Sequence, residues 1–430
     1  MKKVIIAGCT AAVMGFGAIS FAATGNAAAP SSSVEGQIIV KFRDNGVAAS
    51  LLRQHGLSES TGIGSTGAHL IKVPAGKESQ LIESLSRNPA IEYAEPDALV
   101  TAASVDEYFT SQYALHNEGQ AFTNTEGDIK IAGGTGDADV DAAEAWDALS
   151  SSSSSTTTAA AATTVAVLDS GVDNNHPDIA EKVDGHVNFS NGETGDDKYG
   201  HGTHVAGIIA ATKDNGIGVA GVCPTCRILD VKVLNDTGYG STSAIANGIN
   251  WAVSKGAKVI NMSLGQRTSS RTLEAAVSNA WNKGAVIVAA AGNTGTTSKI
   301  YPAAYTNVIA VAATDNNDLK ASFSTHGAKW VDVAAPGANV YSTFPNHPFY
   351  LEEQYNRSQG YDVANGTSMA SPIVAGVAAL AWSAQPGATN TSVRGYVEKT
   401  ADQISGTGTY WAHGRVNANS AVQVAQRSGG

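Results

Sequence analysis

The chain has 430 residues, with 27 lysines and arginines against 38 aspartates and glutamates, so its formal net charge is −11. This charge argues against a nucleic-acid partner, because proteins that bind phosphate backbones carry basic surfaces. Hydrophobic residues make up 43% of the chain and charged residues only 15%, which is enough to bury a core and excludes a disordered chain. The length allows two or three domains.

The N-terminus has the pattern of a secretory signal peptide. Lys2 and Lys3 precede an apolar run at residues 4–23, and small residues follow up to Ala29. A membrane anchor is the alternative, but a run of about 20 residues rich in Gly, Ala and Ser is marginal for spanning a bilayer. We therefore expect residues 1–29 to be removed on export, leaving an extracellular protein without a membrane attachment.

Residues 30–103 are predicted to form a small α+β domain. About 70 residues are just enough to sustain one hydrophobic core. The periodicity predicts a strand, a helix, a strand, a helix and a final extended segment, at residues 37–42, 48–55, 69–73, 78–87 and 91–96.

The remaining residues, 104–430, have the pattern of a parallel α/β sheet. Continuous apolar runs indicate strands buried on both faces, and helical patterns lie between them. The runs cover residues 165–168, 228–233, 259–262, 285–290 and 308–312, and the helical patterns residues 142–149, 243–255 and 271–283. Ligand sites in such sheets cluster at the carboxyl ends of the strands.

A run at residues 150–164 consists almost entirely of Ser, Thr and Ala. Such a run could be a domain linker, but the sequence on both sides follows one alternating pattern. We expect a surface loop inside a single catalytic domain.

Two cysteines, Cys223 and Cys226, remain after the signal and are separated by two residues. In an exported protein this spacing favours a disulfide within a small loop. A redox role would need a helix beginning at Cys223, whereas residues 227–233 have a strand pattern. A zinc site would need two further ligands, and none stands at a suitable spacing.

Three segments carry polar groups that core packing does not require. Asp169 ends a buried strand, His201 begins an apolar helix in the sequence HGTHVAG, and Ser368 stands in NGTSMASP before a long apolar helix. Each has a simpler explanation by itself: a strand-end carboxylate, a metal pair of His201 with His204, or a helix N-cap at Ser368.

Together, the order and surroundings of these segments resemble the subtilisin-like serine peptidase family, the subtilases, over residues 104–430. Residues 30–103 resemble the inhibitory propeptide of that family. The resemblance implies an α/β fold, a subtilisin-like parallel sheet flanked by helices, preceded by a small α+β ferredoxin-like propeptide domain.

The resemblance implies an Asp-His-Ser triad, and the chemistry of these residues agrees with it. A serine hydroxyl needs a neighbouring base, and a neutral imidazole can accept its proton and return it to the leaving amine. His201 is predicted to be that base, Asp169 to hold its ring, and Ser368 to attack the peptide carbonyl. Asn293, which follows a buried strand, matches the side-chain donor to the oxyanion; by itself it would be a turn residue.

Subtilases bind a substrate as an extended strand between two backbone segments, so we expect broad specificity for protein and peptide substrates. Ile300 at the pocket floor predicts a preference for small or medium apolar side chains, and the expected self-cleavage region, residues 99–104, is of that kind. The matching residues are Gly238, Tyr239 and Gly240 for one segment, Ser263, Leu264 and Gly265 for the other, and Ala290, Ala291, Gly292 and Ile300 for the rest of the primary pocket.

The resemblance also implies structural Ca²⁺, held by hard oxygen ligands. The candidate ligands are Asp106, Asp178, Asp214 and Asn215, and solvated loop carboxylates are the alternative. Residues 345–360 are an insertion that could border the leaving-group side.

The sequence thus predicts a secreted, monomeric serine endopeptidase that removes its own propeptide, which acts as an intramolecular inhibitor and folding aid. A dibasic processing peptidase would need acidic pocket walls, which the assigned residues lack. An inactive subtilase scaffold that serves as a binding or adhesion protein is the alternative from another class.

Overall fold

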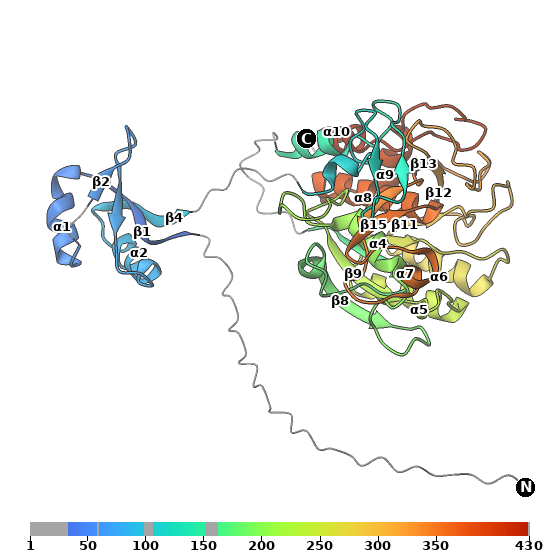
Figure 1. Ribbon diagram of the computed structural model, residues 1–430, viewed down its shortest axis with the longest axis horizontal. Helices are drawn as coiled ribbons and strands as arrows, with labels where there is room; N and C mark the ends of the chain where they lie inside the picture. Colours follow the sequence, from blue (N-terminus) through green and yellow to red (C-terminus); the bar gives the residue numbers. More distant parts are fainter. Residues whose placement is uncertain (1–32, 58–59, 99–105, 151–161, 429–430) are drawn as a thin grey trace, which may run out of the picture. The chain divides into compact units, whose positions relative to one another are not determined.

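The computed structural model describes residues 33–57, 60–98, 106–150 and 162–428, which form two compact units, residues 1–102 and 103–430 (Figure 1). Three predictions lie wholly or mostly outside the described residues: the signal peptide at 1–29, the self-cleavage region at 99–104 and the Ser/Thr/Ala run at 150–164.

The N-terminal unit is a four-stranded antiparallel sheet with two helices. Its strands lie in the order β2-β3-β1-β4, and the helices follow β1 and β3, which gives the βαββαβ arrangement of a ferredoxin-like fold. Ile38, Val40 and Phe42 alternate along β1 and meet apolar residues of both helices, so both helices cover one face. The elements are β1 (Ser33–Phe42), η1 (Asn45–Val47), α1 (Ala48–Gln54), β2 (Ser60–Gly62), β3 (Ala68–Lys72), α2 (Glu78–Ser86) and β4 (Ile91–Ala98).

The second unit is built on a seven-stranded parallel sheet in the order β13-β12-β11-β10-β7-β9-β8. The chain crosses from one side of β7 to the other between β9 and β10. Ligand sites form at such a change of direction, at the carboxyl ends of the strands. The strands are β7 (Thr164–Asp169), β8 (Val183–Asn188), β9 (Arg227–Lys232), β10 (Val259–Met262), β11 (Val286–Ala290), β12 (Val308–Thr314) and β13 (Val333–Pro336).

Helices cover both faces of this sheet, and alternate strand residues enter two separate cores. Val165 and Val167 pack toward α4 and α8, whereas Ala166 and Leu168 pack toward α5 and α6. The continuous apolar runs are therefore explained by burial on both faces. The α-helices are α3 (Ala142–Ser150), α4 (His201–Ala210), α5 (Thr242–Ser254), α6 (Arg271–Asn282), α7 (Tyr350–Tyr355), α8 (Thr367–Ala384), α9 (Asn390–Lys399) and α10 (Ala418–Ser428).

Shorter elements complete the unit. Among the described residues, α8 alone is long and apolar enough to span a membrane by length and composition, and most of its side chains are buried in the core. The short elements are η2 (Phe109–Ser111), β5 (Phe122–Thr123), β6 (Lys130–Ile131), η3 (Ala180–Lys182) and the antiparallel pair β14 (Val340–Thr343) and β15 (Tyr361–Ala364).

The structure confirms the predicted α/β class and adds two strands, β8 and β13, that the sequence pattern did not reveal. β8 lies at the sheet edge and has only partly buried or exposed residues, so it lacks a continuous apolar run. β13 has four residues and ends in proline, which gives too short a pattern to recognise.

Candidate active site

The structure brings Asp169 and His201 together at the carboxyl end of β7. Nδ1 of His201 lies 2.7 Å from Oδ1 of Asp169, and the aspartate is 1% exposed. Burial opposes the charged form of His201, but the Asp169 carboxylate and its hydrogen bond outweigh that effect and raise the pKa of His201 above its usual 6.5. Nε2 is left as the ring nitrogen that can act on another group.

A second buried carboxylate, Asp197, fixes the beginning of α4, where His201 is the first residue. It accepts hydrogen bonds from the backbone N–H groups of Gly200 and Thr203, each at 2.8 Å. These are among the donors that the first turn of a helix leaves without partners. Asp197 also accepts from the hydroxyls of Ser170 and Thr203, so it joins the α4 terminus to the end of β7. Sequence reasoning missed this residue.

Ser368 is the second residue of α8, where the backbone N–H has no acceptor inside the helix. Pro372 stands four residues later and has no N–H to donate to the Ser368 carbonyl. The hydroxyl of Ser263 donates to that carbonyl instead, at 2.7 Å, and Oγ of Ser368 donates to the Ser263 carbonyl at 3.2 Å. Two hydrogen bonds, one donated by each residue, thus join the candidate nucleophile Ser368 to Ser263 at the end of β10.

Asn261 and Ser371 support this arrangement through hydrogen bonds to Ser263 and to each other, and neither was predicted. The amide of Asn261 donates to Oγ of Ser263 at 3.0 Å and accepts from Oγ of Ser371 at 2.7 Å. Both Asn261 and Ser371 are fully buried. A polar pair inside an apolar strand and an apolar helix is a signal that could have identified them.

Asn293 lies beside the start of α8. Its Oδ1 accepts from the backbone N–H of Thr367 at 2.9 Å and from the Thr367 hydroxyl at 3.0 Å. These two donors fix which side of the amide is oxygen, so the remaining amide nitrogen is free to donate. A Cβ added to Gly366 would lie 3.2 Å from that nitrogen, which places the donor at the turn that leads into Ser368.

Two adjoining pockets share the segment Ser263, Leu264 and Gly265. One is lined by His201 and by the predicted backbone segment Gly238, Tyr239 and Gly240, together with Tyr199, Leu234, Ile245, Gln266, Leu273 and Tyr301. The other is lined by Ser368 and Asn293, together with Gln266, Arg267, Ala290, Gly292, Ile300 and Thr367. The side chain of Ala291 packs into the core with Val331 and Trp411 while its two neighbours line the pocket.

Ile300 fills the space between the two walls of the Ser368 pocket. A Cβ added to Gly265 would lie 2.5 Å from Ile300, and one added to Gly292 would lie 2.8 Å from it. The branched side chain therefore contacts both glycine walls and limits the depth of the pocket. Among the described residues, no acidic side chain lines either pocket.

Three of the four predicted calcium ligands meet away from these pockets. Asp106 accepts from the backbone N–H groups of Asp214 and Asn215, each at 3.0 Å, and Asp178 accepts from the Asn215 amide at 2.6 Å. Burial raises the pKa of Asp178, and the Asp106 charge adds to the shift. Asp214 contributes its backbone N–H to this group, while its carboxylate contacts Lys213.

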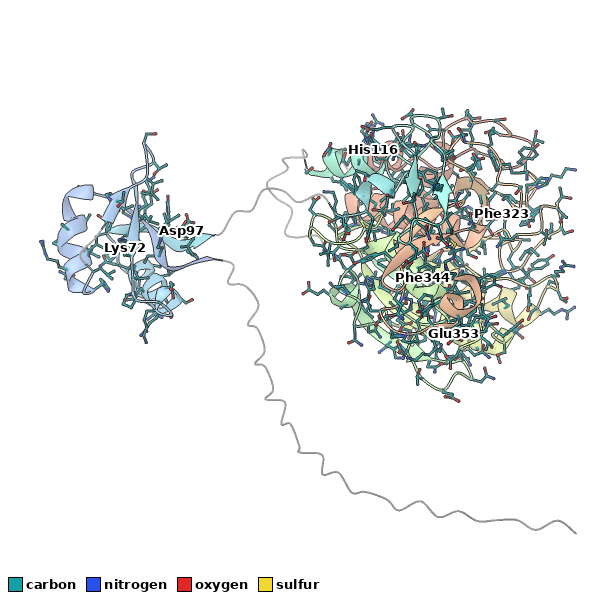
Figure 2. The ribbon with its side chains drawn as sticks, in the orientation of Figure 1. Lys72, Asp97, His116, Phe323, Phe344 and Glu353 are labelled. Carbon is teal, nitrogen blue, oxygen red and sulfur yellow. A yellow bond between two sulfur atoms is a disulfide. The ribbon has the colours of Figure 1, made fainter. Side chains whose placement is uncertain are left out.

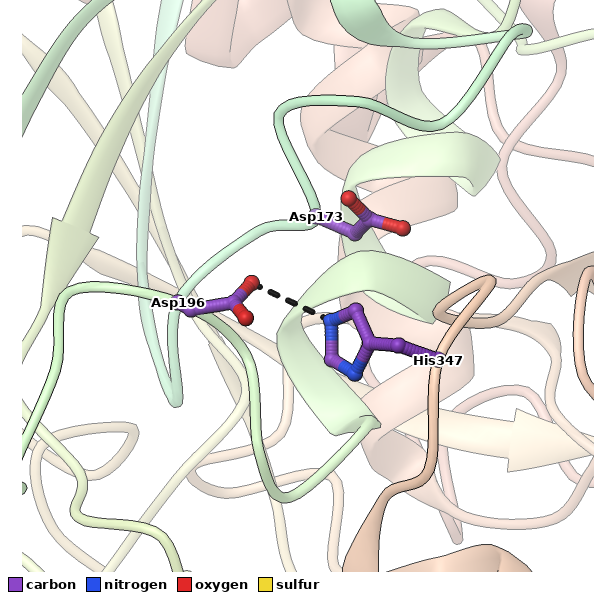
Figure 3. Close-up of side chains that lie close together, drawn as sticks. All are labelled: Asp173, Asp196 and His347. Carbon is purple, nitrogen blue, oxygen red and sulfur yellow. Dashed lines mark hydrogen bonds and ion pairs between the residues drawn. The ribbon is translucent and has the colours of Figure 1, made fainter. Parts of the chain in front are cut away.

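Two further groups of side chains could hold a metal ion, each with its ligand atoms within 4.8 Å of one another. One consists of Asp173, Asp196 and His347, which come from three separate segments (Figure 3). The other consists of Asp139, Asp141 and Glu144.

The cysteine prediction is confirmed by a disulfide between Cys223 and Cys226, and both residues are fully buried. The alternative pairing of His201 with His204 as metal ligands does not form one site. Nε2 of His204 lies 3.3 Å from the Asp362 carbonyl, and its ring packs against Phe344 at 4.7 Å.

Comparison with known proteins decides the family. The subtilase family model matches residues 160–426 of the chain. The chain belongs to the subtilase family. A second model, the fervidolysin N-terminal prodomain, matches residues 22–97, so this subtilase carries an N-terminal prodomain.

Relatives and a solved structure agree with this family. Thermitase of Thermoactinomyces vulgaris is 49% identical over 285 residues, covering 66% of this subtilase and 94% of thermitase. The thermophilic serine proteinase of Bacillus sp. strain AK1 is 41% identical over 396 residues, covering 90% of this chain and 88% of the relative. A solved protease structure from Pseudoalteromonas arctica matches with a TM-score of 0.61 and 29% identity, covering 75% of this chain and all of that one. This subtilase is a serine endopeptidase.

Proposed function

We propose that Ser368, His201 and Asp169 are the catalytic triad of this endopeptidase. The observation that carries the assignment is the 2.7 Å contact of His201 with buried Asp169, in a pocket that shares Ser263, Leu264 and Gly265 with the pocket that Ser368 lines. Ser368 attacks the peptide carbonyl, and Nε2 of His201 takes its hydroxyl proton and later gives it to the leaving amine. Water then releases the acyl group from Ser368 by the same proton transfers.

Two donors stabilise the oxyanion that forms when Ser368 attacks. One is the Ser368 backbone N–H, which points out of the first turn of α8 along with the positive end of the helix dipole. The other is the amide nitrogen of Asn293, which the bonds from Thr367 leave available. Donors fixed in advance stabilise the developing charge without reorganisation during the reaction.

The pocket that contains Ser368 receives the side chain before the scissile bond. Ile300 restricts its depth, which supports a preference for small or medium apolar side chains. The described lining of both pockets lacks acidic side chains, which argues against a dibasic specificity. The segments at 238–240 and 263–265 bind the substrate backbone as an added strand, so cleavage is broad. Sequencing the products of a denatured protein tests this, since a strong preference for Phe or Tyr before the cut would contradict it.

The prodomain inhibits the peptidase until it is cut off near residue 104, and the signal at residues 1–29 directs export of a monomeric enzyme.

Ca²⁺ is held by Asp106, Asp178 and Asn215. Two carboxylates that are each at most 3% exposed repel one another here, and a divalent cation would relieve that repulsion. The ion stabilises the fold and takes no part in catalysis.

The triad is tested with a fluorophosphonate probe, which reacts only with an activated serine. The probe is expected to label one residue, Ser368, and to stop casein hydrolysis by the enzyme that has removed its prodomain. Ser368→Ala and His201→Ala abolish labelling, while the surface control Ser254→Ala labels like wild type. Labelling of wild type at another serine would refute the assignment. No labelling and no hydrolysis would favour the inactive scaffold.

A further inference from the structure

The segment of residues 345–360, between β14 and β15, has no part in the chemistry described above. It carries α7, and it precedes the turn that leads to Ser368. The first N–H groups of a short helix need acceptors outside it. The N–H of Tyr350 donates to the Lys198 carbonyl at 2.9 Å, and that of Leu351 donates to the Tyr199 carbonyl at 3.2 Å. The helix is therefore docked on the segment that precedes His201.

Polar contacts hold the beginning of the 345–360 segment in the same place. Nε2 of His347 lies 3.2 Å from Oδ1 of Asp196, and the two side chains point at one another with Asp173 beside them (Figure 3). Asp173 is 1% exposed and accepts from the backbone N–H of Asn346 at 3.0 Å. These contacts join the 345–360 segment to the loop that follows Asp169 and to the loop that precedes His201.

An aromatic contact completes the docking. Phe349 stacks on Phe344 at 5.2 Å and lies against Gly200, where an added Cβ would be 2.3 Å from the Phe349 ring. Gly200 has a φ of 100°, so both its conformation and this close approach exclude a larger residue. Figure 2 labels Phe344 and, on α7, Glu353.

The docked helix places tyrosines at the edge of the pocket that contains His201. The Tyr199 ring stacks on Tyr350 at 5.5 Å with an interplanar angle of 23°, and lies 6.4 Å from the His201 ring. Burial raises the pKa of Tyr199, and the charge of Tyr355 is the next largest cause of the shift.

These rings are also accessible. Tyr350 is 36%, Tyr355 64% and Tyr239 75% exposed, and they are three of the seven large exposed hydrophobic residues among those described. Exposed tyrosines offer rigid apolar faces with a polar tip, which suits them to bind another chain. Tyr239 and Tyr199 line the pocket of His201, and Tyr350 stacks on Tyr199, so the chain that these rings suit is the peptide substrate.

We propose that Tyr350 and Tyr355 of α7, together with Tyr199, form an aromatic wall that binds the substrate side chain two positions before the scissile bond and favours an aromatic residue there. This inference rests on the proposed function of Ser368 and deepens it. Tyr199 lines the His201 pocket with Leu234 and the Gly238–Gly240 segment, and an added Cβ on Gly238 would be 2.6 Å from the Tyr199 ring. The wall therefore faces the acyl side of the substrate.

The test compares two quenched peptides that differ only in Phe or Ala two positions before the cut. In wild type that has removed its prodomain, kcat/KM is expected to favour Phe by about tenfold, the size of a few aromatic contacts. The double variant Tyr350→Ala/Tyr355→Ala is expected to lose most of this ratio. Glu353→Ala, a change of an exposed residue on the same helix, keeps it. A second peptide pair varies the residue after the cut.

Two results would overturn the proposal while normal fluorophosphonate labelling of Ser368 leaves the proposed function standing. One is a Phe/Ala ratio that the double variant leaves unchanged, with or without an equal loss of kcat/KM for both peptides. The other is a loss of discrimination confined to the residue after the cut. Absence of labelling and of turnover in wild type would overturn the proposed function and this inference with it.

Discussion

At the scale of single residues, the geometry of the site follows from which donor or acceptor each polar group finds when its usual partner is missing. Pro372 leaves the Ser368 carbonyl without its helical donor, and the Ser263 hydroxyl fills that place. Thr367 occupies the oxygen of Asn293 and leaves the amide nitrogen to act as a donor. Hydrogen bonds from Ser263 and Thr367 thus orient the candidate reacting groups.

Asn293→Ala is expected to lower kcat by about 10²–10³, which is the size measured within this family for loss of an oxyanion donor. The amide stabilises charge only in the transition state, so KM should change little. Steady-state kinetics on a small peptide measures both constants. A variant that keeps most of its kcat would exclude Asn293 from the oxyanion site.

The acid limb of the pH profile reports on His201. Only the neutral imidazole can act as base, and the Asp169 carboxylate raises the pKa of His201, so kcat/KM should fall at a midpoint above pH 6.5 as the pH is lowered. Asp169→Asn removes the carboxylate charge that raises the pKa of His201, and leaves burial, which lowers it. The midpoint should therefore move below pH 6.5, and activity should fall by about 10⁴. An acid limb that stays in place in the variant would contradict this account.

At the scale of elements, α4 is fixed by contacts at its beginning and by contacts one turn further along. Asp197 binds the N–H groups at its beginning. One turn later, His204 is fully buried against Phe344. Burial lowers the pKa of His204 to about 3, with the charge on His201 adding to the effect, so His204 is neutral in the folded enzyme.

This shift predicts a pH-dependent loss of stability. Between pH 6.5 and 3 the unfolded chain binds a proton at His204 that the folded chain does not, so stability falls as the pH falls. In a Ser368→Ala background, the free energy of unfolding should drop by about 2 kcal/mol more in the parent than in His204→Gln between pH 7.5 and pH 5. Urea unfolding measures this difference, and a gap that is the same at both values would refute it.

The elements could be predicted, and candidates for the triad could be named, because their signals are local. β7, β10 and β11 are continuous apolar runs, and HGTHVAG and NGTSMASP are specific motifs. Asp197 and Asn261 were missed because each also joins two elements that meet only in the folded chain. Asp197 links the beginning of α4 to Ser170 after β7, and Asn261 links β10 to Ser371 of α8. The strand β8 lacks an apolar run because it lies at the sheet edge, where all of its residues are partly buried or exposed.

At the scale of the whole molecule, the chain is a prodomain followed by a peptidase unit whose first described residue is tied to the fold. Asp106, the first described residue of that unit, is 3% exposed and accepts from three backbone N–H groups at residues 214–216. Its neighbour Asp178 places a second carboxylate there. Binding of an ion at this point would join Asp106 to the loop that follows α4.

Chelation tests that ion. In a Ser368→Ala background, which prevents autolysis, EDTA should lower the thermal midpoint by several degrees, since a ligand at about 100 times its Kd contributes about 3 kcal/mol. Asp178→Asn should start from a lower midpoint and respond little to EDTA, whereas the surface control Glu274→Gln should respond like its parent. If EDTA left the thermal midpoint of every variant unchanged, the proposed calcium site would be refuted.

The central claim is that Ser368 is the nucleophile of a peptidase that matures itself. Intact mass and N-terminal sequencing of wild type and Ser368→Ala, both expressed without the signal, test it most directly. We predict that wild type alone becomes a fragment beginning near residue 104 and that Ser368→Ala stays joined to its prodomain. Equal processing of both chains, or two full-length chains that do not cut casein, would contradict the account.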